Sequence, residues 1–376
     1  SAIQVALYED DCCYSRHLPL ALRTRLATDS IAFATEKMPK FHALLEDTYY
    51  FSESGLESVE EMALGFVELR FYIRALIERG IDVDAFAPRI GILLTCRMDL
   101  FEEIAKIRAS RRLYARMMKE EFGARDARSM ALTVTAHTSG LTMTAQQPVN
   151  NVARGGMQAL AMALAGVQAM EVSTFDEAYR TPSEEAHLVG LRTQQIVQLE
   201  TNVTKVADPL GGSYYVEALT DEMERRIAAE VVRIEAAGDI AELAERGYFR
   251  RIFVNAMERL GRDLADGTLQ RVGDTCHTVP EDEDRMLKDA AERKIEPCHE
   301  QIDRIRDFKC SRDQNRVKQA LGALHDAARD ESCNLMVSYI AALTADATVG
   351  ETAGVLRQAY GQAYDPLAGL PSPLDG

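Results

Sequence analysis

Short apolar runs at residues 41–45, 129–136 and 168–172 each end in polar side chains that could act as acids, bases or hydrogen-bond partners. If these runs are parallel strands, their carboxyl ends converge on one mouth, as they do in βα barrels. Taken singly, an Asp-Glu pair before a helix or a Tyr pair after a strand is more typical of capping or packing. Convergence of three such loops favours a site. The candidate side chains are Tyr49, Tyr50, Glu53, His137, Glu171, Ser173, Asp176 and Glu177.

Basic residues stand at the beginnings of two apolar runs. Arg89 and Arg128 occupy these positions, and each could bind a phosphate-bearing ligand or equally form a salt bridge. Three further arginines, Arg108, Arg111 and Arg112, lie within a helical pattern, and we interpret them as a solvated helix face.

The elements that must position these residues alternate between strand and helix as far as about residue 200. The segment Ser58-Val-Glu-Glu61 predicts a capping box that opens a helix. Repeated units of a strand followed by a helix are typical of a parallel sheet, either open or closed into a barrel. We therefore predict an α/β protein with a TIM-type βα barrel, represented by its later strands, followed by a helical C-terminal region. The predicted strands are 2–5, 89–95, 129–136 and 168–172, and the predicted helices are 58–80, 99–117, 151–166 and 181–203.

Strand signals stop after Glu217. Thr220 has the residue type of a helix cap and Gly238 that of a helix end. Residues 266–300 are polar, which indicates a linker or an irregular wrap. The predicted domains are 1–217, a substrate-binding barrel portion; 218–265, a helical extension; 266–300, a linker; and 301–376, a C-terminal helical region and tail.

Composition excludes several kinds of partner. A net charge of −16 argues against binding to nucleic acid or to an anionic membrane. No apolar run approaches the roughly 20 residues of a membrane span. The seven cysteines include no C-x-x-C pair, and the histidines show no metal-ligand spacing. These features predict a reduced, cytoplasmic protein without a metal site.

Several sequence blocks also resemble the large chain of the cobalamin-dependent acyl-CoA mutases. The resemblance covers nearly the whole chain and includes the blocks DAFAPRI, TAQQPVNN, STFDEA, LRTQQI and DPLGGSYYVE. It implies a βα barrel with the pantetheine arm of a CoA thioester along its axis. It also implies a partner domain or subunit that presents adenosylcobalamin for a radical 1,2 shift of the carbon skeleton. We accordingly expect an isomerase that forms hetero- or homo-oligomers.

The resemblance also assigns roles to single residues. It implies that Gln4 contacts the acyl group and that Tyr49 lies between substrate and adenosyl group. Glu177 matches a ribose-binding glutamate and Glu53 a glutamate on the cofactor side. The matches to CoA contacts are Arg89, Arg128 and Gln168. We therefore expect Tyr49, Gln168 and Glu177 to line one tunnel.

Departures from the family gather at the predicted mouth. Tyr50 replaces a histidine that hydrogen-bonds the thioester carbonyl, His137 replaces a glutamine near the corrin, and Glu171 begins E-V-S where the family has H-T-N. The arginine that holds a free carboxylate in methylmalonyl enzymes aligns near Tyr14, with Arg16 close by. These changes indicate a substrate other than methylmalonyl-CoA.

Two alternatives to such a mutase remain open. One is a catalytically inactive structural subunit that pairs with an active mutase chain. The other is a cobalamin-independent enzyme with His137 and Glu171 as its acid–base pair. The resemblance implies that the earlier barrel strands and the cobalamin-binding domain come from another chain or from sequence outside these 376 residues.

Overall fold

The predicted β–α repeats form one parallel sheet with helices packed against it. The computed structural model describes residues 3–4, 7–12, 18–292, 297–367 and 369–375. The chain divides into two compact units. One contains the described residues up to 12 together with 42–292; the other contains 18–41 and the described residues from 297 onward.

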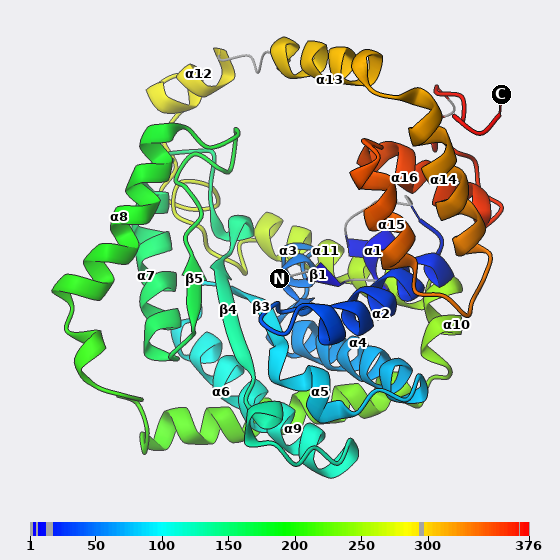
Figure 1. Cartoon of the computed structure of the whole chain (residues 1–376). Coiled ribbons are helices and arrows are strands. Elements are labelled where there is room, and N and C mark those ends of the chain that lie inside the picture. Colours follow the sequence, from blue (N-terminus) through cyan, green and yellow to red (C-terminus); the bar gives the residue numbers. More distant parts are fainter. Residues whose placement is uncertain (1–2, 5–6, 13–17, 293–296, 368, 376) are drawn as a thin grey trace. The chain divides into compact units, whose positions relative to one another are not determined.

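All strands of the first unit run parallel in sequence order (Figure 1). The α/β class with a parallel sheet is thereby confirmed. The edges of the described sheet are β1 and β5, so closure into a barrel stays a prediction. The strands are β1 (Ile3–Gln4), β2 (Leu44–Asp47), β3 (Ile90–Cys96), β4 (Thr133–Thr138) and β5 (Ala169–Glu171).

The helices that follow the strands have local reasons to begin where they do. The side chain of Asp99 accepts a hydrogen bond from the Glu102 amide, and that of Ser183 accepts one from the Ala186 amide. Helices α3 (Tyr49–Glu53), α4 (Ser58–Glu78), α5 (Val83–Phe86), α6 (Leu100–Arg116), α7 (Asn150–Leu164) and α8 (Glu184–Glu200) belong to this part of the chain. The capping box of α4 lies one residue earlier than predicted, since Glu57 and Glu60 exchange the two hydrogen bonds.

Buried and partly exposed residues alternate along β4, which distinguishes the two faces of the sheet. Val134, Ala136 and Thr138 are buried, whereas the alternate residues from Thr133 to His137 are partly exposed. Successive side chains of a strand point to opposite faces, and α7 contacts β3, β4 and β5. The buried face therefore packs on helices, and the half-open face is the one that a barrel would enclose.

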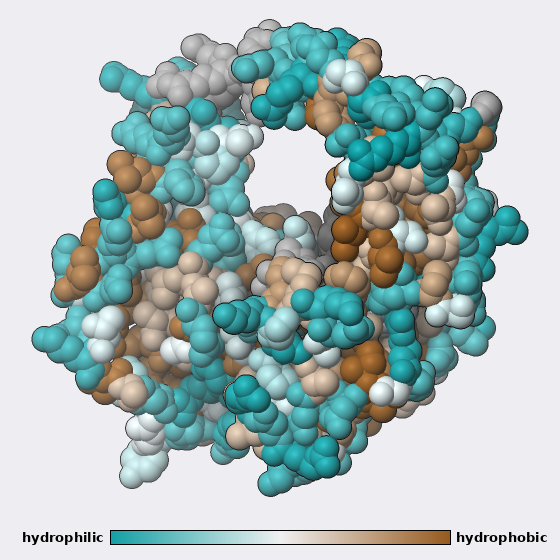
Figure 2. Space-filling view, viewed as in Figure 1, coloured by the Kyte–Doolittle hydropathy of each residue, from teal (hydrophilic) through white to brown (hydrophobic). Residues whose placement is uncertain are grey.

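Helix α8 keeps an apolar strip on its outer surface. Leu188, Leu191, Ile196 and Leu199 are exposed, and Figure 2 shows brown, apolar surface over this helix. Beneath it, Ala186, Gly190 and Val197 are buried. The helix α8 and the edge strand β5 thus form one apolar boundary of the described sheet unit.

The chain after Glu217 departs from two predictions. Thr220 does not cap a helix; it lies inside α9 (Tyr214–Glu235), where its hydroxyl donates to the Val216 carbonyl. A threonine hydroxyl can bond the preceding turn as well as a helix start, so residue type alone misplaces the boundary. The segment predicted as a linker contains α12 (Arg285–Glu292), and α10 (Ile240–Glu245) and α11 (Tyr248–Ala265) precede it.

The second unit is helical, as predicted for the C-terminal region, but it also includes α2 (Leu20–Lys37). Its core contains Leu22 with Leu321 and Leu324. The Arg25 guanidinium donates to the carbonyls of Ala327 and Ala328 at 3.1 and 2.7 Å. The C-terminal helices are α13 (His299–Ser311), α14 (Gln314–Ala328), α15 (Leu335–Thr344) and α16 (Val349–Ala359).

Candidate active site

The carboxyl ends of β2, β4 and β5 bring most of the predicted site residues together. The rings of Tyr49 and His137 lie 4.7 Å apart, and Tyr50 is 5.8 Å from Tyr49. Tyr49 is half-buried, whereas Tyr50 is 40% exposed. Burial, reinforced by Glu53 and Glu177, raises the pKa of Tyr49. Tyr49 therefore stays an uncharged phenol at neutral pH.

His137 is held in one orientation. Its Nδ1 lies 2.6 Å from the carbonyl oxygen of Thr138, and the Ser173 hydroxyl is 3.5 Å away. A carbonyl only accepts, so Nδ1 must carry the proton, and the neutral ring presents a lone pair on Nε2. Nε2 is 3.7 Å from Glu171, its register partner on β5. The pair can move a proton at Nε2.

Two glutamates approach the mouth from different loops. Glu53 accepts hydrogen bonds from the Ser139 hydroxyl at 2.6 Å and the Leu141 amide at 2.9 Å. Burial raises the pKa of Glu53 although these bonds oppose the shift. A Cβ at Gly140 would lie 3.2 Å from Glu53 and 3.9 Å from a Glu177 oxygen. The two carboxylates therefore flank Gly140, where a larger side chain would crowd them.

The residues matched to CoA contacts lie at the opposite, amino-terminal end of the strands. Arg89 directly precedes β3, and Arg128, 78% exposed, pairs with Asp126 at 2.6 Å in the turn before β4. The Gln168 side chain accepts a hydrogen bond of 2.7 Å from the Val134 amide. Tyr49 and Glu177 thus meet at the mouth, and Gln168 does not join them there.

Some predicted residues are not placed at the site. Gln4 pairs through its backbone with Glu46 on β2, and only its backbone is described. Tyr14 and Arg16 lie outside the described residues. Asp176 is buried and accepts from the Thr174 hydroxyl and the Ser183 amide, so it organises its own loop.

Sequence reasoning missed a buried ion cluster behind Tyr49. Lys106 contacts Glu61 at 2.8 Å and Glu103 at 2.7 Å. Glu61 in turn accepts from the Thr95 amide, and the Thr95 hydroxyl donates to the Tyr49 carbonyl at 3.2 Å. The Glu103–Lys106 spacing on the inward face of α6 was the available signal. This cluster fixes the start of α3 and with it the tyrosine.

Asp47, the last residue of β2, was also missed. It is only 1% exposed. Neither carboxyl oxygen makes a hydrogen bond of good geometry with a described residue. The Tyr49 and Tyr50 amides nevertheless lie near enough to lower its pKa. Burial prevails and raises the pKa of Asp47 to about 7. A carboxyl group that titrates near neutrality therefore lies directly before the mouth.

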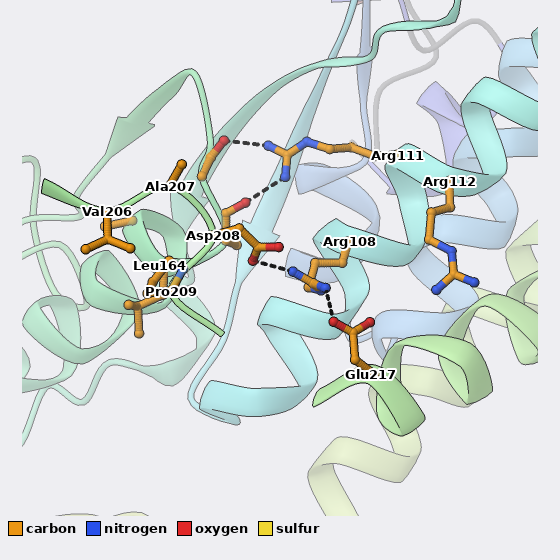
Figure 3. Close-up of a pocket in the computed structure, with 12 residues that line it drawn as sticks. Arg108, Arg111, Arg112, Leu164, Val206, Ala207, Asp208, Pro209 and Glu217 are labelled. Atoms are coloured by element: carbon orange, nitrogen blue, oxygen red, sulfur yellow. Dashed lines mark hydrogen bonds and ion pairs between the residues drawn. The ribbon is translucent and has the colours of Figure 1, made fainter. Parts of the chain in front are cut away.

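Of the arginines Arg108, Arg111 and Arg112 on α6, the last is exposed, as the sequence suggests, whereas the first two are partly buried. All three line a cavity of about 500 Å³ against Asp208 and Glu217 (Figure 3). Arg108 pairs with both carboxylates, and Arg111 donates to the carbonyls of Ala165 and Gly166 at 2.6 Å each. These arginines hold α6 to its neighbours, and carboxylates compensate the charges of Arg108 and Arg112.

In the described part of the chain, no group of three or more His, Cys, Asp or Glu residues is arranged to hold a metal ion. None of the described helices combines the length and apolar character needed to cross a membrane.

Comparison with known proteins gives the family. The sequence model of methylmalonyl-CoA mutase matches residues 14–362. The chain is 35% identical over 343 residues to the 2-hydroxyisobutanoyl-CoA mutase large subunit of Aquincola tertiaricarbonis, covering 91% of the chain and 61% of that protein. It is 34% identical over 340 residues to methylmalonyl-CoA mutase of Rhizobium meliloti, covering 90% and 47%. For methylmalonyl-CoA mutase of Escherichia coli the identity is 31% over 365 residues, covering 97% and 51%. The chain spans about half to three fifths of the length of these relatives, and it belongs to the methylmalonyl-CoA mutase family.

Proposed function

We propose that this chain is the substrate-binding part of an acyl-CoA mutase that carries out a radical 1,2 rearrangement of a CoA thioester. Adenosylcobalamin would be bound mainly by a partner domain or subunit. The observation that carries the proposal is that candidate residues lie at both ends of the parallel strands, taken together with family membership. The basic residues Arg89 and Arg128 precede their strands, and Tyr49 and His137 lie where strands end.

The separation of the two ends suits a long ligand. The six residues of β4 span about 20 Å at the usual rise of a strand. A thioester with its phosphates near Arg128 could therefore extend along the half-open face towards His137. The pair of Arg128 with Asp126 is exposed and contributes little, so its guanidinium can still meet a phosphate.

The mouth suits the adenosyl side of the cofactor. Bound there, adenosylcobalamin would supply the radical that takes a hydrogen atom from the substrate. Glu177 and Glu53 offer carboxylate oxygens on both sides of Gly140, which are suitable acceptors for ribose hydroxyls. Tyr49 would separate cofactor from substrate and exclude water. Together with Glu171, His137 would take up or release a proton at Nε2.

The charge of the mouth argues for an acyl group without a free carboxylate. Glu53, Glu171 and Glu177 approach it, and Arg97, the nearby cation, donates to Ser52 through Nε and Nη2. A second carboxylate on the acyl group would meet like charges, so we infer that the substrate is not methylmalonyl-CoA.

We further propose that the whole protein closes the sheet into a barrel. The edge strand β5 and the apolar strip on α8 offer a backbone edge and an apolar face of the kind that further βα units cover. The domain boundaries predicted from the sequence belong to the same proposal.

Two substitutions should distinguish the roles of the two ends of the site. Tyr49→Ala should lower kcat by about 100-fold or more with little change in KM, because it acts on orientation at the reacting end. Arg128→Ala should raise KM about 10-fold, as expected for one lost phosphate contact of about 1.4 kcal/mol. Both are measured as cobalamin-dependent isomerisation by the whole protein with its partner, over a panel of acyl-CoA thioesters. Arg125→Ala is the matched control, since Arg125 is 80% exposed in the same turn.

Calorimetry with the same thioesters tests the alternative of a catalytically inactive subunit. Binding that weakens in Arg128→Ala supports a substrate-binding chain. A whole protein that neither binds nor converts any thioester would favour the inactive subunit and refute the proposed mutase activity.

A further inference from the structure

A second cavity, of about 380 Å³, lies outside the sheet face that the proposed substrate would occupy. It opens between the first turn of α7 and the segment 269–272. The volume falls in the range of small-molecule sites, about 300–1,000 Å³. Its lining combines apolar side chains with two arginines and contains no acidic residue: Met98, Thr142, Asn150, Ala153, Arg154, Leu269, Gln270, Arg271 and Val272.

Both arginines are fixed in place largely by neutral oxygens. Arg154 donates to the Val272 carbonyl through Nη2 and to the side chains of Thr144 and Asn151 through Nη1. Arg271 donates to the Leu141 carbonyl at 2.8 Å, and its acidic neighbour, Asp274, is 3.5 Å away. Arg154 is thus held without a close carboxylate, unlike Arg108, whereas Arg271 also forms an ion pair with Asp274.

The local electrostatics agree with an excess of positive charge. Burial lowers the pKa of Arg154, and the charge of Arg271 lowers it further. Burial also lowers the pKa of Arg271, and the charge of Asp274 opposes the shift in both arginines. Both groups stay protonated at neutral pH because arginine starts from such a high pKa. The amino-terminal end of α7, whose dipole favours anions, borders the same cavity. In a chain of net charge −16, this cavity is a local exception.

We propose that this cavity binds a small organic oxyanion, a phosphate monoester or a carboxylate, between Arg154 and Arg271. Arginine forks suit either group because both accept paired hydrogen bonds. Met98, Leu269 and Val272 provide an apolar wall for the organic part of the ligand. The site is separate from the proposed thioester path. The Leu141 amide donates to Glu53 at the mouth, whereas the Leu141 carbonyl accepts from Arg271 at the cavity.

Calorimetry on the whole protein at low ionic strength tests the proposal, with inorganic phosphate, phenyl phosphate and benzoate as probes. Phenyl phosphate and benzoate distinguish the two oxyanion classes, and inorganic phosphate reports the contribution of the apolar wall. We expect at least one organic probe to bind, and Arg154→Gln and Arg271→Gln each to weaken it 10-fold or more. Arg112→Gln, which removes an equal charge from α6, should leave binding unchanged.

A second pair of variants keeps the test independent of the arginines' role in folding. Leu269 is 40% exposed at the cavity, so Leu269→Glu should fold and place a carboxylate beside Arg271. Leu269→Glu should abolish binding and Leu269→Gln should retain most of it. No binding by any probe, equal binding by both Leu269 variants, or equal weakening by Arg112→Gln would overturn the proposal. None of these measurements depends on mutase activity.

Discussion

Asp47→Asn should raise the free energy of unfolding by about 3 kcal/mol more near pH 8 than near pH 5. Asp47 is buried at the end of β2, and burial raises the pKa of its carboxyl from 3.8 to about 7. Asparagine has nearly the same shape and carries no charge at either pH. Urea unfolding of wild type and variant across this pH range measures the difference.

The sign follows from which state binds the proton. Between the unfolded pKa of 3.8 and the folded pKa of about 7, the folded carboxyl of Asp47 is protonated and the unfolded one is ionised. Each unit of rising pH in this window therefore costs the folded wild type about 1.4 kcal/mol. The loss is complete above the folded pKa, and the asparagine variant never incurs it.

Asp282 is exposed, and Asp282→Asn is the matched control. Its free energy of unfolding should differ from that of the wild type by the same amount at each pH. Glu46 is also buried with a raised pKa, and the charge of Asp47 contributes to that shift, so the substitution relieves this repulsion as well and acts in the same direction. A difference between wild type and Asp47→Asn that stays constant from about pH 5 to about pH 8 would contradict the assignment. The cost of this buried carboxyl in stability points to a role at the mouth.

The parts of the site that the sequence predicts are those that depend on local pattern. Parallel strands must end at one edge, so the meeting of Tyr49, His137 and Glu171 could be inferred from apolar runs and the polar residues after them. The same rule places Arg89 and Arg128 at the other end. The start of α6 was predicted to within one residue, and there the Asp99 side chain caps the helix.

The parts that the sequence could not predict depend on contacts between distant segments. The pairing of Lys106 with Glu61 joins residues on two helices, and neither residue type is usually buried. Thr220 lies inside α9 because packing of that helix overrides its tendency to cap. The sharing of Glu53 between Ser139 and Leu141 likewise appears only once two loops are placed together.

Lys106→Met should lower the free energy of unfolding by about 3–5 kcal/mol, the range for breaking a buried ion pair on one side. Lys106 is fully buried, and it is the cation that meets both Glu61 and Glu103. Methionine fills a similar volume but leaves two carboxylates in a region without water. Urea unfolding with an unchanged slope measures the loss.

Arg112→Met on the same helix is the matched control. Arg112 is 45% exposed and pairs with Asp221 and Glu224, so its loss should cost less than about 1 kcal/mol. Equal losses for the two variants would show that α6 tolerates any lost cation and would contradict the special role of the buried one.

The pH dependence of the Lys106→Met loss gives a second check on its cause. Burial already raises the pKa of Glu103 beside the lysine, and without the lysine the two carboxylates should bind a proton more tightly. The loss should therefore be smaller near pH 5 than near pH 8, and Lys106→Met combined with Glu61→Gln should recover part of it. A loss independent of pH would point to packing alone. Because Glu61 and Thr95 connect Lys106 to the Tyr49 carbonyl, the same variant should also loosen the mouth before the sheet unfolds.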